Sequence, residues 1–299
     1  MIQIGVDFGG TKIEAAALGG DGAFLVRQRV PTPDTYPAAI RAVADLVAAV
    51  EAEVGQVRSI GVGLPGSISP RTGAMRNANT VYLNGSSFRE DLAHASGRQV
   101  RIANDANCLA LSEARDGAAA GAHVTFAVII GTGCGGGVVV GGELIEGANG
   151  IAGEWGHIPL PWAREDELPG PDCWCGQRNC LEKWISGTGF RKDFERRSGR
   201  LLKGEEIVEL ARNGDPIAAA TLDDYIDRLG RGLAIIANIL DPDCFVMGGG
   251  MSNVTELYGR LPAVIDRHTF SDGWQGKIVQ AKWGDSSGVR GAAHLWPAS

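Results

Sequence analysis

Two glycine-rich segments constrain the fold of this chain more than any other feature. The first is Asp7-Phe8-Gly9-Gly10-Thr11-Lys12, and the second is Gly131-Thr132-Gly133-Cys134-Gly135-Gly136-Gly137, about 120 residues later. Each lies between runs of apolar and β-branched residues, and each is followed by a further glycine pair and another such run. The repeated strand–turn–strand pattern predicts an internal duplication, with one domain beginning at each copy.

The glycines in these segments are typical of phosphate-binding turns. Glycine lets backbone N–H groups approach an anion closely, and it permits left-handed conformations that aim successive N–H groups at one phosphate. Asp7, at the end of a strand, is placed to hold Mg²⁺ through water. The expected phosphate ligands are Gly9, Gly10, Thr11, Lys12, Gly131, Thr132, Gly133 and Gly135. The alternative is a pair of ordinary hairpin turns, but five glycines in seven residues exceed what a hairpin requires.

Two other nucleotide-binding motifs are excluded. Gly131-x-Gly133-x-x-Gly136 matches the dinucleotide fingerprint, which requires a helix directly after the glycines, but the strand-like run Val138–Val140 follows instead. A P-loop, Gly-x₄-Gly-Lys-Ser/Thr, does not occur in the sequence. Paired hairpin phosphate turns on duplicated domains resemble the actin-like ATPase superfamily, which also contains sugar kinases.

Composition narrows the partners. The 299 residues carry a net charge of −7 without a basic stripe, so nucleic acid is not an expected partner. The chain shows neither a signal-peptide pattern nor an apolar run of membrane-spanning length, so we expect a cytoplasmic protein without a membrane partner. Its 44 glycines are about twice the usual share and agree with turns that closely approach a ligand.

Periodicity predicts alternating strands and helices, and hence an α/β fold. The expected helices are Tyr36–Val54, a segment after Asn107 through about Ala114, Asp215–Leu240, and Ser286–Trp296 with Ser286 or Ser287 near its N-cap. Further expected strands are Ser59–Leu64, Val100–Ala103 and Cys244–Met247, the last of which ends in Gly248-Gly249-Gly250.

Asp105 is the candidate catalytic carboxylate. It lies in Asn104-Asp105-Ala106-Asn107, between a predicted strand and a predicted helix, where ligands bind in α/β sheets. Phosphoryl transfer needs positioning, charge neutralisation and one carboxylate that accepts the proton of the attacking hydroxyl. The alternative is that Asp105 only caps the helix.

Three cysteines fall within eight residues, in Cys173-x-Cys175-x₄-Cys180. This spacing suits a shared tetrahedral metal better than disulfides in a reduced compartment. His157 is the best fourth ligand, and four protein ligands would make a structural Zn²⁺ site. That site would brace the loop that carries Glu154 and Glu182, two candidates for binding sugar hydroxyls. The alternative is a set of free thiols and a core histidine.

Together these motifs are similar to those of the ROK family (repressors, open reading frames, kinases) over essentially the whole chain. Asp7–Lys12, Asn104–Asn107 and Gly131–Gly137 match the two phosphate motifs and the catalytic motif. Glu154-x-Gly156-His157 with Cys173-x-Cys175-Gly176-x₃-Cys180-x-Glu182 matches the sugar and zinc signature. Asn179 departs from the pattern, where the family usually has glycine.

Within the family, several stretches are most similar to bacterial fructokinases of the manno(fructo)kinase type. They are Gly66–Pro70, Asn77–Asn79, Ile185–Phe190 and Gly284–Ala293. The resemblance implies ATP- and Mg²⁺-dependent phosphorylation of D-fructose at the 6-hydroxyl, with Asp105 as the base. It also implies a sugar pocket and an adenosine site. The sugar-pocket residues would be Gly66, Asn79, Asn104, Glu154, His157 and Glu182, and the residues beside adenosine would be Gly248, Gly249 and Gly250.

The resemblance further implies a duplicated actin-like (ribonuclease H-like) fold with two lobes around a cleft, and a homodimer. The lobes would span 1–113 with 284–299, and 114–283. Three alternatives stay open. They are the same reaction on mannose, glucose, N-acetylglucosamine or N-acetylmannosamine; a sugar-responsive repressor, disfavoured because six residues precede Asp7; and a chaperone or filament ATPase, disfavoured by the cysteine cluster.

Overall fold

The computed structural model describes residues 2–296, which form two compact units. Unit 1 consists of Met1–Gly121, Gly137–Ala152 and Lys282–Ser299, and unit 2 consists of Ala122–Gly136 and Gly153–Ala281. The chain therefore passes between the units after Gly121, Gly136, Ala152 and Ala281. The domain boundaries expected from the sequence, 1–113 with 284–299 and 114–283, stay a prediction.

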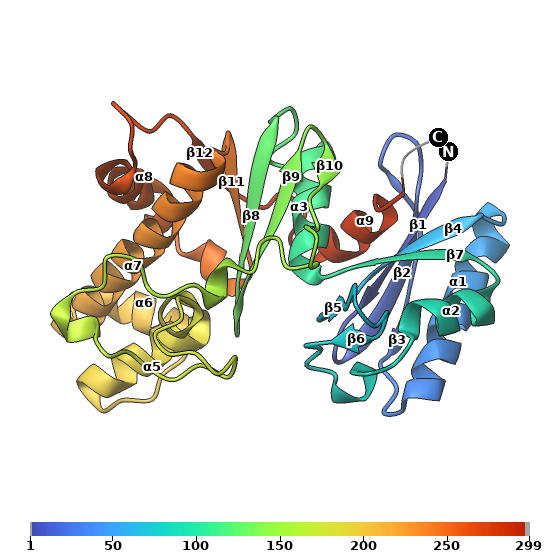
Figure 1. Ribbon diagram of the computed structural model, residues 1–299, viewed down its shortest axis with the longest axis horizontal. Coiled ribbons are helices and arrows are strands. Elements are labelled where there is room, and N and C mark those ends of the chain that lie inside the picture. The colour runs from blue at the N-terminus through green and yellow to red at the C-terminus, as the bar shows by residue number, and fades with distance from the viewer. Residues whose placement is uncertain (1, 297–299) are drawn as a thin grey trace. The chain divides into compact units, whose positions relative to one another are not determined.

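Unit 1 is built on a five-stranded mixed sheet with the order β3-β2-β1-β4-β7 (Figure 1). The strands β1, β2 and β3 are antiparallel neighbours, whereas β1, β4 and β7 are parallel. The bounds are β1 (Gln3–Phe8), β2 (Lys12–Leu18), β3 (Phe24–Pro31), β4 (Ser59–Gly63) and β7 (Gln99–Ala103).

Helices cover this sheet. The helices α1 (Tyr36–Val54) and α2 (Phe88–Ser96) pack against it through a core that includes Ile40, Val43 and Leu92. The helix α9 (Ser287–Ala293), after the short turn η5 (Gly284–Ser286), packs directly on β1 and β4. A Cβ at Gly61 would lie 1.7 Å from the carbonyl oxygen of Ala292, so glycine is required for this close approach.

The remaining elements of unit 1 follow the strand ends. The helix α3 (Asp105–Asp116) comes directly after β7 and packs against α9. The last residues of strand β9 (Cys134–Val140) pair with β10 in this unit. The short elements are β5 (Ser67–Ile68), β6 (Met75–Arg76), η1 (Val81–Leu83) and β10 (Glu143–Leu144).

Unit 2 contains a parallel sheet in which β11 lies between β8 and β12. These strands are β8 (Val124–Ile130), β11 (Cys244–Gly248) and β12 (Lys277–Gln280). Its helices and short turns are η2 (Trp155–His157), η3 (Glu165–Glu167), α4 (Glu182–Ile185), α5 (Gly187–Ser198), α6 (Gly204–Arg212), α7 (Pro216–Leu240), η4 (Gly250–Asn253) and α8 (Glu256–His268).

A buried ionic network holds η3, α5 and α7 together. Arg228 and Arg231, each almost fully buried, donate to Glu167, and Arg228 also donates to Asp193. Burial alone would raise the pKa of Glu167, but hydrogen bonds from Arg231, the Arg164 N–H and Arg228 lower it to about 2. The network is therefore ionised at neutral pH.

Most of the predicted elements are confirmed, and two details are wrong. The second glycine segment is not one long turn, because β9 begins at Cys134 and only Gly131–Gly133 form the connection. Ser286 is the N-cap of α9, as predicted, but this helix ends at Ala293 and not at Trp296. No helix of this described part of the chain is long and apolar enough to cross a membrane.

Candidate functional site

The first phosphate turn, Gly9–Thr11, joins β1 to β2. The Gly9 N–H donates to the carbonyl oxygen of Lys12 at 3.0 Å, which closes the hairpin. Thr11 and Lys12 are exposed at the turn. A Cβ at Gly10 would meet no atom within 4 Å, so nothing in the protein itself requires glycine there. The turn thus leaves open space where a phosphate would approach.

Asp7, at the end of β1, gives this turn its acidic neighbour. Burial, together with the negative charges of Glu14 and Asp105, raises the pKa of Asp7 to about 6. A Cβ at Gly288, in α9, would lie 2.9 Å from the carboxyl carbon of Asp7. Glycine at position 288 therefore leaves room beside a carboxylate that a cation would stabilise in its charged form.

The second phosphate turn, Gly131–Gly133, joins β8 to β9 and carries no charge of its own. The Gly131 N–H donates to Gly133 at 3.0 Å, and the Gly187 N–H donates to Gly131 at 2.7 Å. A Cβ at Gly131 would meet no atom within 4 Å, whereas one at Gly133 would lie 2.9 Å from the Glu182 carboxylate. The turn is therefore packed against the Glu182 carboxylate at Gly133, and the space beside Gly131 is free of protein atoms.

One part of the phosphate-turn interpretation is wrong. Among the described residues, none of Gly9, Gly10, Gly131 or Gly133 has a positive φ, so the left-handed geometry expected from the sequence is absent. Gly135 lies inside β9 rather than in the turn. The missing Cβ, and not unusual backbone conformation, is what glycine contributes at these positions.

Asp105 is the first residue of α3, and it does not cap that helix. The cap is Asn104, whose Oδ1 accepts the N–H of Asn107 at 2.7 Å. Burial raises the pKa of Asp105, although the N–H of Ala106 donates to its Oδ1 at 2.9 Å. The capping alternative for Asp105 is thus contradicted, and the carboxylate remains at the end of β7 for another role.

The four predicted metal ligands are brought together in unit 2. One ligand atom from each of His157, Cys173, Cys175 and Cys180 lies within 4.8 Å of all the others. Sγ of Cys175 and Sγ of Cys180 are 3.6 Å apart, and Sγ of Cys173 lies 3.7 Å from Nδ1 of His157. Ligands about 2.3 Å from a tetrahedral zinc lie about 3.8 Å apart. The donors and their spacing therefore fit zinc and do not fit disulfides.

The local turns explain this arrangement. Isolated β-bridges pair Pro159 with Cys180 and Asp172 with Arg178, which folds the cysteine segment back on the segment after His157. Asn179 has a φ of 61°, a left-handed conformation that asparagine tolerates better than most residues, and its Oδ1 accepts the indole N–H of Trp184. The departure from glycine at this position therefore preserves the turn.

Glu182 links the metal loop to the second phosphate turn. Its Oε2 accepts the N–H of Cys134 at 3.0 Å, and its Oε1 accepts the indole N–H of Trp174 at 3.0 Å. Glu154 is exposed directly before η2, the turn that carries His157. In unit 1, Asn79 is exposed, and Gly66 has a φ of 87°.

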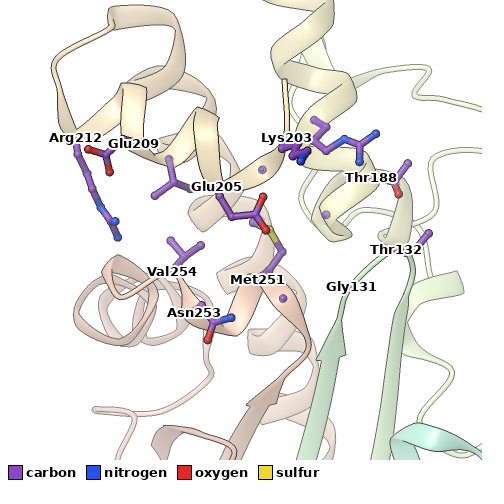
Figure 2. A pocket seen from close by; sticks show the side chains of 15 residues that line it. Gly131, Thr132, Thr188, Lys203, Glu205, Glu209, Arg212, Met251, Asn253 and Val254 are labelled. Carbon is purple, nitrogen blue, oxygen red and sulfur yellow. The ribbon is translucent and has the colours of Figure 1, made fainter. Parts of the chain in front are cut away.

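Unit 2 also contains a cavity of about 690 Å³ that begins at the second phosphate turn (Figure 2). Gly131 and Thr132 lie on one side and Arg212 and Val254 on the other. The cavity is lined by Gly131, Thr132, Gly187, Thr188, Arg191, Lys203, Gly204, Glu205, Val208, Glu209, Arg212, Gly250, Met251, Asn253 and Val254.

One face of α6 forms a wall of this cavity, and the sequence analysis did not identify it. Glu205, Val208, Glu209 and Arg212 all line the cavity, at helical spacings of three and four residues. Of the predicted adenosine-site glycines, Gly250 lines the cavity. Gly248 is buried at the end of β11, and a Cβ at Gly249 would lie 2.5 Å from the carbonyl oxygen of Ile130, so glycine at position 249 permits close packing.

The fold and the two phosphate turns define a protein of the actin-like ATPase class. Within that class the chain belongs to the ROK family, whose model matches residues 3–299. The ROK hexokinase of Thermus thermophilus is 34% identical with a TM-score of 0.87, over 98% of this chain and 97% of that chain. A ROK family glucokinase from Streptomyces griseus, in complex with glucose and AMPPNP, is 29% identical with a TM-score of 0.77, over 99% of each chain.

Two curated relatives are both named as kinases of one sugar. An N-acetyl-D-glucosamine kinase of Pectobacterium atrosepticum is 39% identical over 296 residues, which cover 97% of each protein. The corresponding kinase of Salmonella paratyphi C is 38% identical, over 97% of this chain and 98% of that protein. These relatives are not fructokinases, so they leave the predicted fructokinase subgroup without support.

Proposed function

We propose that this chain is an ATP-dependent kinase that phosphorylates the 6-hydroxyl of N-acetyl-D-glucosamine. The observation that carries the kinase chemistry is the second phosphate turn at the edge of the cavity in unit 2. The choice of sugar follows the curated relatives, which share 38–39% of their residues with this chain. This sugar is one of the alternatives that the sequence left open, and it replaces fructose as the preferred substrate.

The nucleotide is assigned to unit 2. We propose that the purine packs against Val208, Met251 and Val254, the apolar part of the cavity, and that the phosphates meet the turn at Gly131 and Thr132. Backbone N–H groups suit phosphate oxygens because they present positive dipoles without bulky side chains. The α6 face and Asn253 supply the polar groups that surround the purine and ribose.

The first turn supplies the charges for phosphoryl transfer. Lys12 neutralises phosphate oxygens, and Asp7 holds the Mg²⁺ that accompanies ATP through water. Asp105 accepts the proton of the attacking hydroxyl. Burial raises the pKa of Asp105, which makes it a stronger base than an ordinary aspartate. Catalysis then rests on positioning and charge neutralisation, as in other phosphoryl transfers.

The sugar is held by hydrogen bonds from polar side chains. We assign this role to Asn79, Asn104, Glu154, His157 and Glu182, with Gly66 shaping the nearby turn. When Nδ1 of His157 binds a metal, Nε2 keeps its proton and donates to a sugar hydroxyl. Sugar specificity depends on which sugar hydroxyls form hydrogen bonds in the site. A sugar that leaves a buried polar group of the site unpaired loses far more binding free energy than one that lacks a methylene.

Zinc is proposed as a structural ion at His157, Cys173, Cys175 and Cys180. With four protein ligands it has no open position, so it stabilises the loop and contributes no step of the reaction. Elemental analysis of the purified protein should find about one zinc per chain. Cys180→Ser should lower both the zinc content and the melting temperature, and full zinc occupancy in that variant would contradict the assignment.

The substrate proposal is tested by ADP release with each sugar in turn. We expect kcat/KM to be highest for N-acetylglucosamine and lower for glucose, mannose, N-acetylmannosamine and fructose. A higher kcat/KM for glucose or fructose would move the assignment to that sugar. No ADP release with any of them would reject the kinase. Homodimer formation and cytoplasmic location stay predictions, and light scattering on the eluted protein tests the first.

A further inference from the structure

Glu113, in the last turns of α3, is a fully buried carboxylate that the proposed reaction does not use. Its Oε1 accepts the N–H of Trp283 at 3.0 Å and the hydroxyl of Ser287 at 3.1 Å. Its Oε2 accepts the N–H of Lys282 at 2.9 Å and the N–H of Ala118 at 2.8 Å. A carboxylate has about four lone-pair sites, so these donors satisfy all of them.

Within residues 2–296, no lysine or arginine side chain forms an ion pair with the Glu113 carboxylate. The nearby cations are engaged elsewhere: Nζ of Lys282 donates to the carbonyl oxygen of Asp116, and Arg290 pairs with the Asp116 carboxylate. Three backbone N–H groups and one hydroxyl therefore hold the buried negative charge, and each fixes a particular piece of backbone or side chain.

The donors lie beside two of the four places where the chain passes between the units. Lys282 is the first residue of unit 1 after the passage at Ala281, and Trp283 follows it. Ala118 lies three residues before the passage at Gly121. Glu113 thus fastens two segments, far apart in sequence, to the same end of α3.

The other end of α3 carries the proposed base and meets a third passage. Asp105 is the first residue of this helix. Gly137, the first residue of unit 1 after Gly136, approaches α3 so closely that a Cβ there would lie 2.5 Å from the carbonyl oxygen of Ala106. A single twelve-residue helix therefore connects the base with the anchored chain passages.

We propose that Glu113 is a positioning residue for phosphoryl transfer. It fixes the register of α3 against the chain passages at Gly121 and Ala281, and through α3 it fixes the position of Asp105. This role rests on the proposed kinase function. It goes beyond stability, because it acts on the transfer step and leaves the nucleotide cavity, which belongs entirely to unit 2, unchanged.

Gly117 offers a second way to disturb the same carboxylate. A Cβ at Gly117 would lie 2.2 Å from Oε2 of Glu113. Gly117 has a φ of −97° and a ψ of −146°, a combination outside the main regions for residues with a Cβ, and the same Cβ would lie 2.6 Å from Cα of Glu113. Gly117→Ala therefore displaces the Glu113 side chain together with the end of α3, while keeping the charge of Glu113.

The test uses Glu113→Gln, Gly117→Ala and the control Glu51→Gln. The side-chain amide of a glutamine at position 113 has one NH₂ group in place of a carboxylate oxygen. This NH₂ group faces two of the four hydrogen-bond donors and cannot accept a hydrogen bond from either of them. Glu51 is also a buried carboxylate of unit 1, but its partners are Arg98 and the N–H of Val57, away from the passages. The readouts are AMPPNP affinity, kcat for sugar phosphorylation, and amide exchange of the peptide containing Lys282 and Trp283.

We expect both test variants to lower kcat by about 10-fold or more, because small displacements of a reacting group are costly. The affinity for AMPPNP should change by less than about twofold, because a change that affects only the geometry of the transition state lowers kcat without weakening nucleotide binding. The Lys282–Trp283 amides should exchange faster in both test variants. Glu51→Gln should leave kcat, affinity and this exchange near the wild-type values.

Three outcomes would overturn the proposal. They are a wild-type kcat in Glu113→Gln, an equal loss of kcat in Glu51→Gln, or faster exchange at Lys282–Trp283 without loss of kcat in either test variant. The wild-type assay is read first. Wild-type protein that transfers no phosphate to any sugar rejects the proposed function itself, which distinguishes that failure from a failure of the Glu113 assignment.

Discussion

The two glycine-rich turns share a strand–turn–strand frame but differ in what surrounds them. The turn between β1 and β2 lies beside Asp7 and Lys12, and burial and neighbouring acids raise the pKa of Asp7 to about 6. The turn between β8 and β9 has no charged residue of its own and is braced from behind by Glu182. We propose from this comparison that the first turn supplies charge for phosphoryl transfer and that the second is a neutral cradle for the nucleotide.

The largest loss of kcat should come from replacing Asp105, the proposed base, whose charge acts on Asp7 beside the first turn. Asp105→Asn keeps the size of the side chain but removes the proton acceptor, so we expect kcat to fall by about 10²–10⁴-fold. AMPPNP affinity and the melting temperature should stay close to wild type, because the helix is capped by Asn104. Stopped-time assays of sugar phosphate measure the loss. Turnover within a few fold of wild type would refute Asp105 as the base.

In the second turn, Gly131→Val should weaken nucleotide binding without lowering the free energy of unfolding. The added side chain meets no protein atom near its Cβ but occupies the space assigned to phosphate, so we expect AMPPNP affinity to fall by about 10-fold or more. Gly137→Ala is the contrast, because its Cβ collides with Ala106 and Ala110. It should cost about 1–3 kcal/mol of unfolding free energy and leave the affinity of folded protein unchanged. Equal nucleotide affinities in the two variants would remove the cradle assignment.

A smaller difference should appear between the polar side chains of the two turns. Hydrogen bonds from a charged group contribute about 1.5–3 kcal/mol and those from a neutral group about 0.5–1.5 kcal/mol. Lys12→Met should therefore lower kcat/KM for ATP more than Thr132→Val does, and its deficit should depend on salt. Initial rates at low and high ionic strength provide the measurement. A larger loss in Thr132→Val would reverse the comparison.

The smallest effect is a shift in pH dependence. A general base must be ionised, so activity rises with pH through its pKa. Burial raises the pKa of Asp105, and the acid limb of the kcat profile should therefore lie above the usual range for an aspartate. Rates measured from pH 4 to 8 locate the limb. A profile that stays flat down to pH 4 would argue against a buried carboxylate as the base.

Much of the fold was predictable because its signals are local and strong. The helix Tyr36–Val54 has the predicted bounds, because its apolar residues recur at helical spacing. Asp215 caps α7, and Pro216 occupies the first position of that helix, where proline is favoured. The helix α6 was missed. Four of its nine residues, Ile207, Val208, Leu210 and Ala211, are apolar at helical spacing, so the sequence held a signal for the helix, but its charged face has meaning only beside the cavity that it lines.

The candidate site likewise contains some residues that the sequence predicts and others that it does not. The grouping of His157 with the three cysteines was predictable because metal ligands require particular residue types at close spacing. The extent of the second turn was not, because glycine occurs in turns and in strands that pack closely, and Gly137 is of the second kind. Glu113 resembles any helical surface charge in the sequence. Its role depends on Lys282 and Ala118, which only the folded chain brings to it.

The central claim is that the charged turn and the neutral turn serve one transfer from ATP to N-acetylglucosamine. A competition assay tests it most directly: equal concentrations of N-acetylglucosamine, glucose and fructose are incubated with the protein, Mg²⁺ and limiting ATP, and the products are identified by phosphorus NMR and mass spectrometry. The account predicts N-acetylglucosamine 6-phosphate as the main product. A main product of glucose phosphate or fructose phosphate, or ATP left unconsumed, would contradict it.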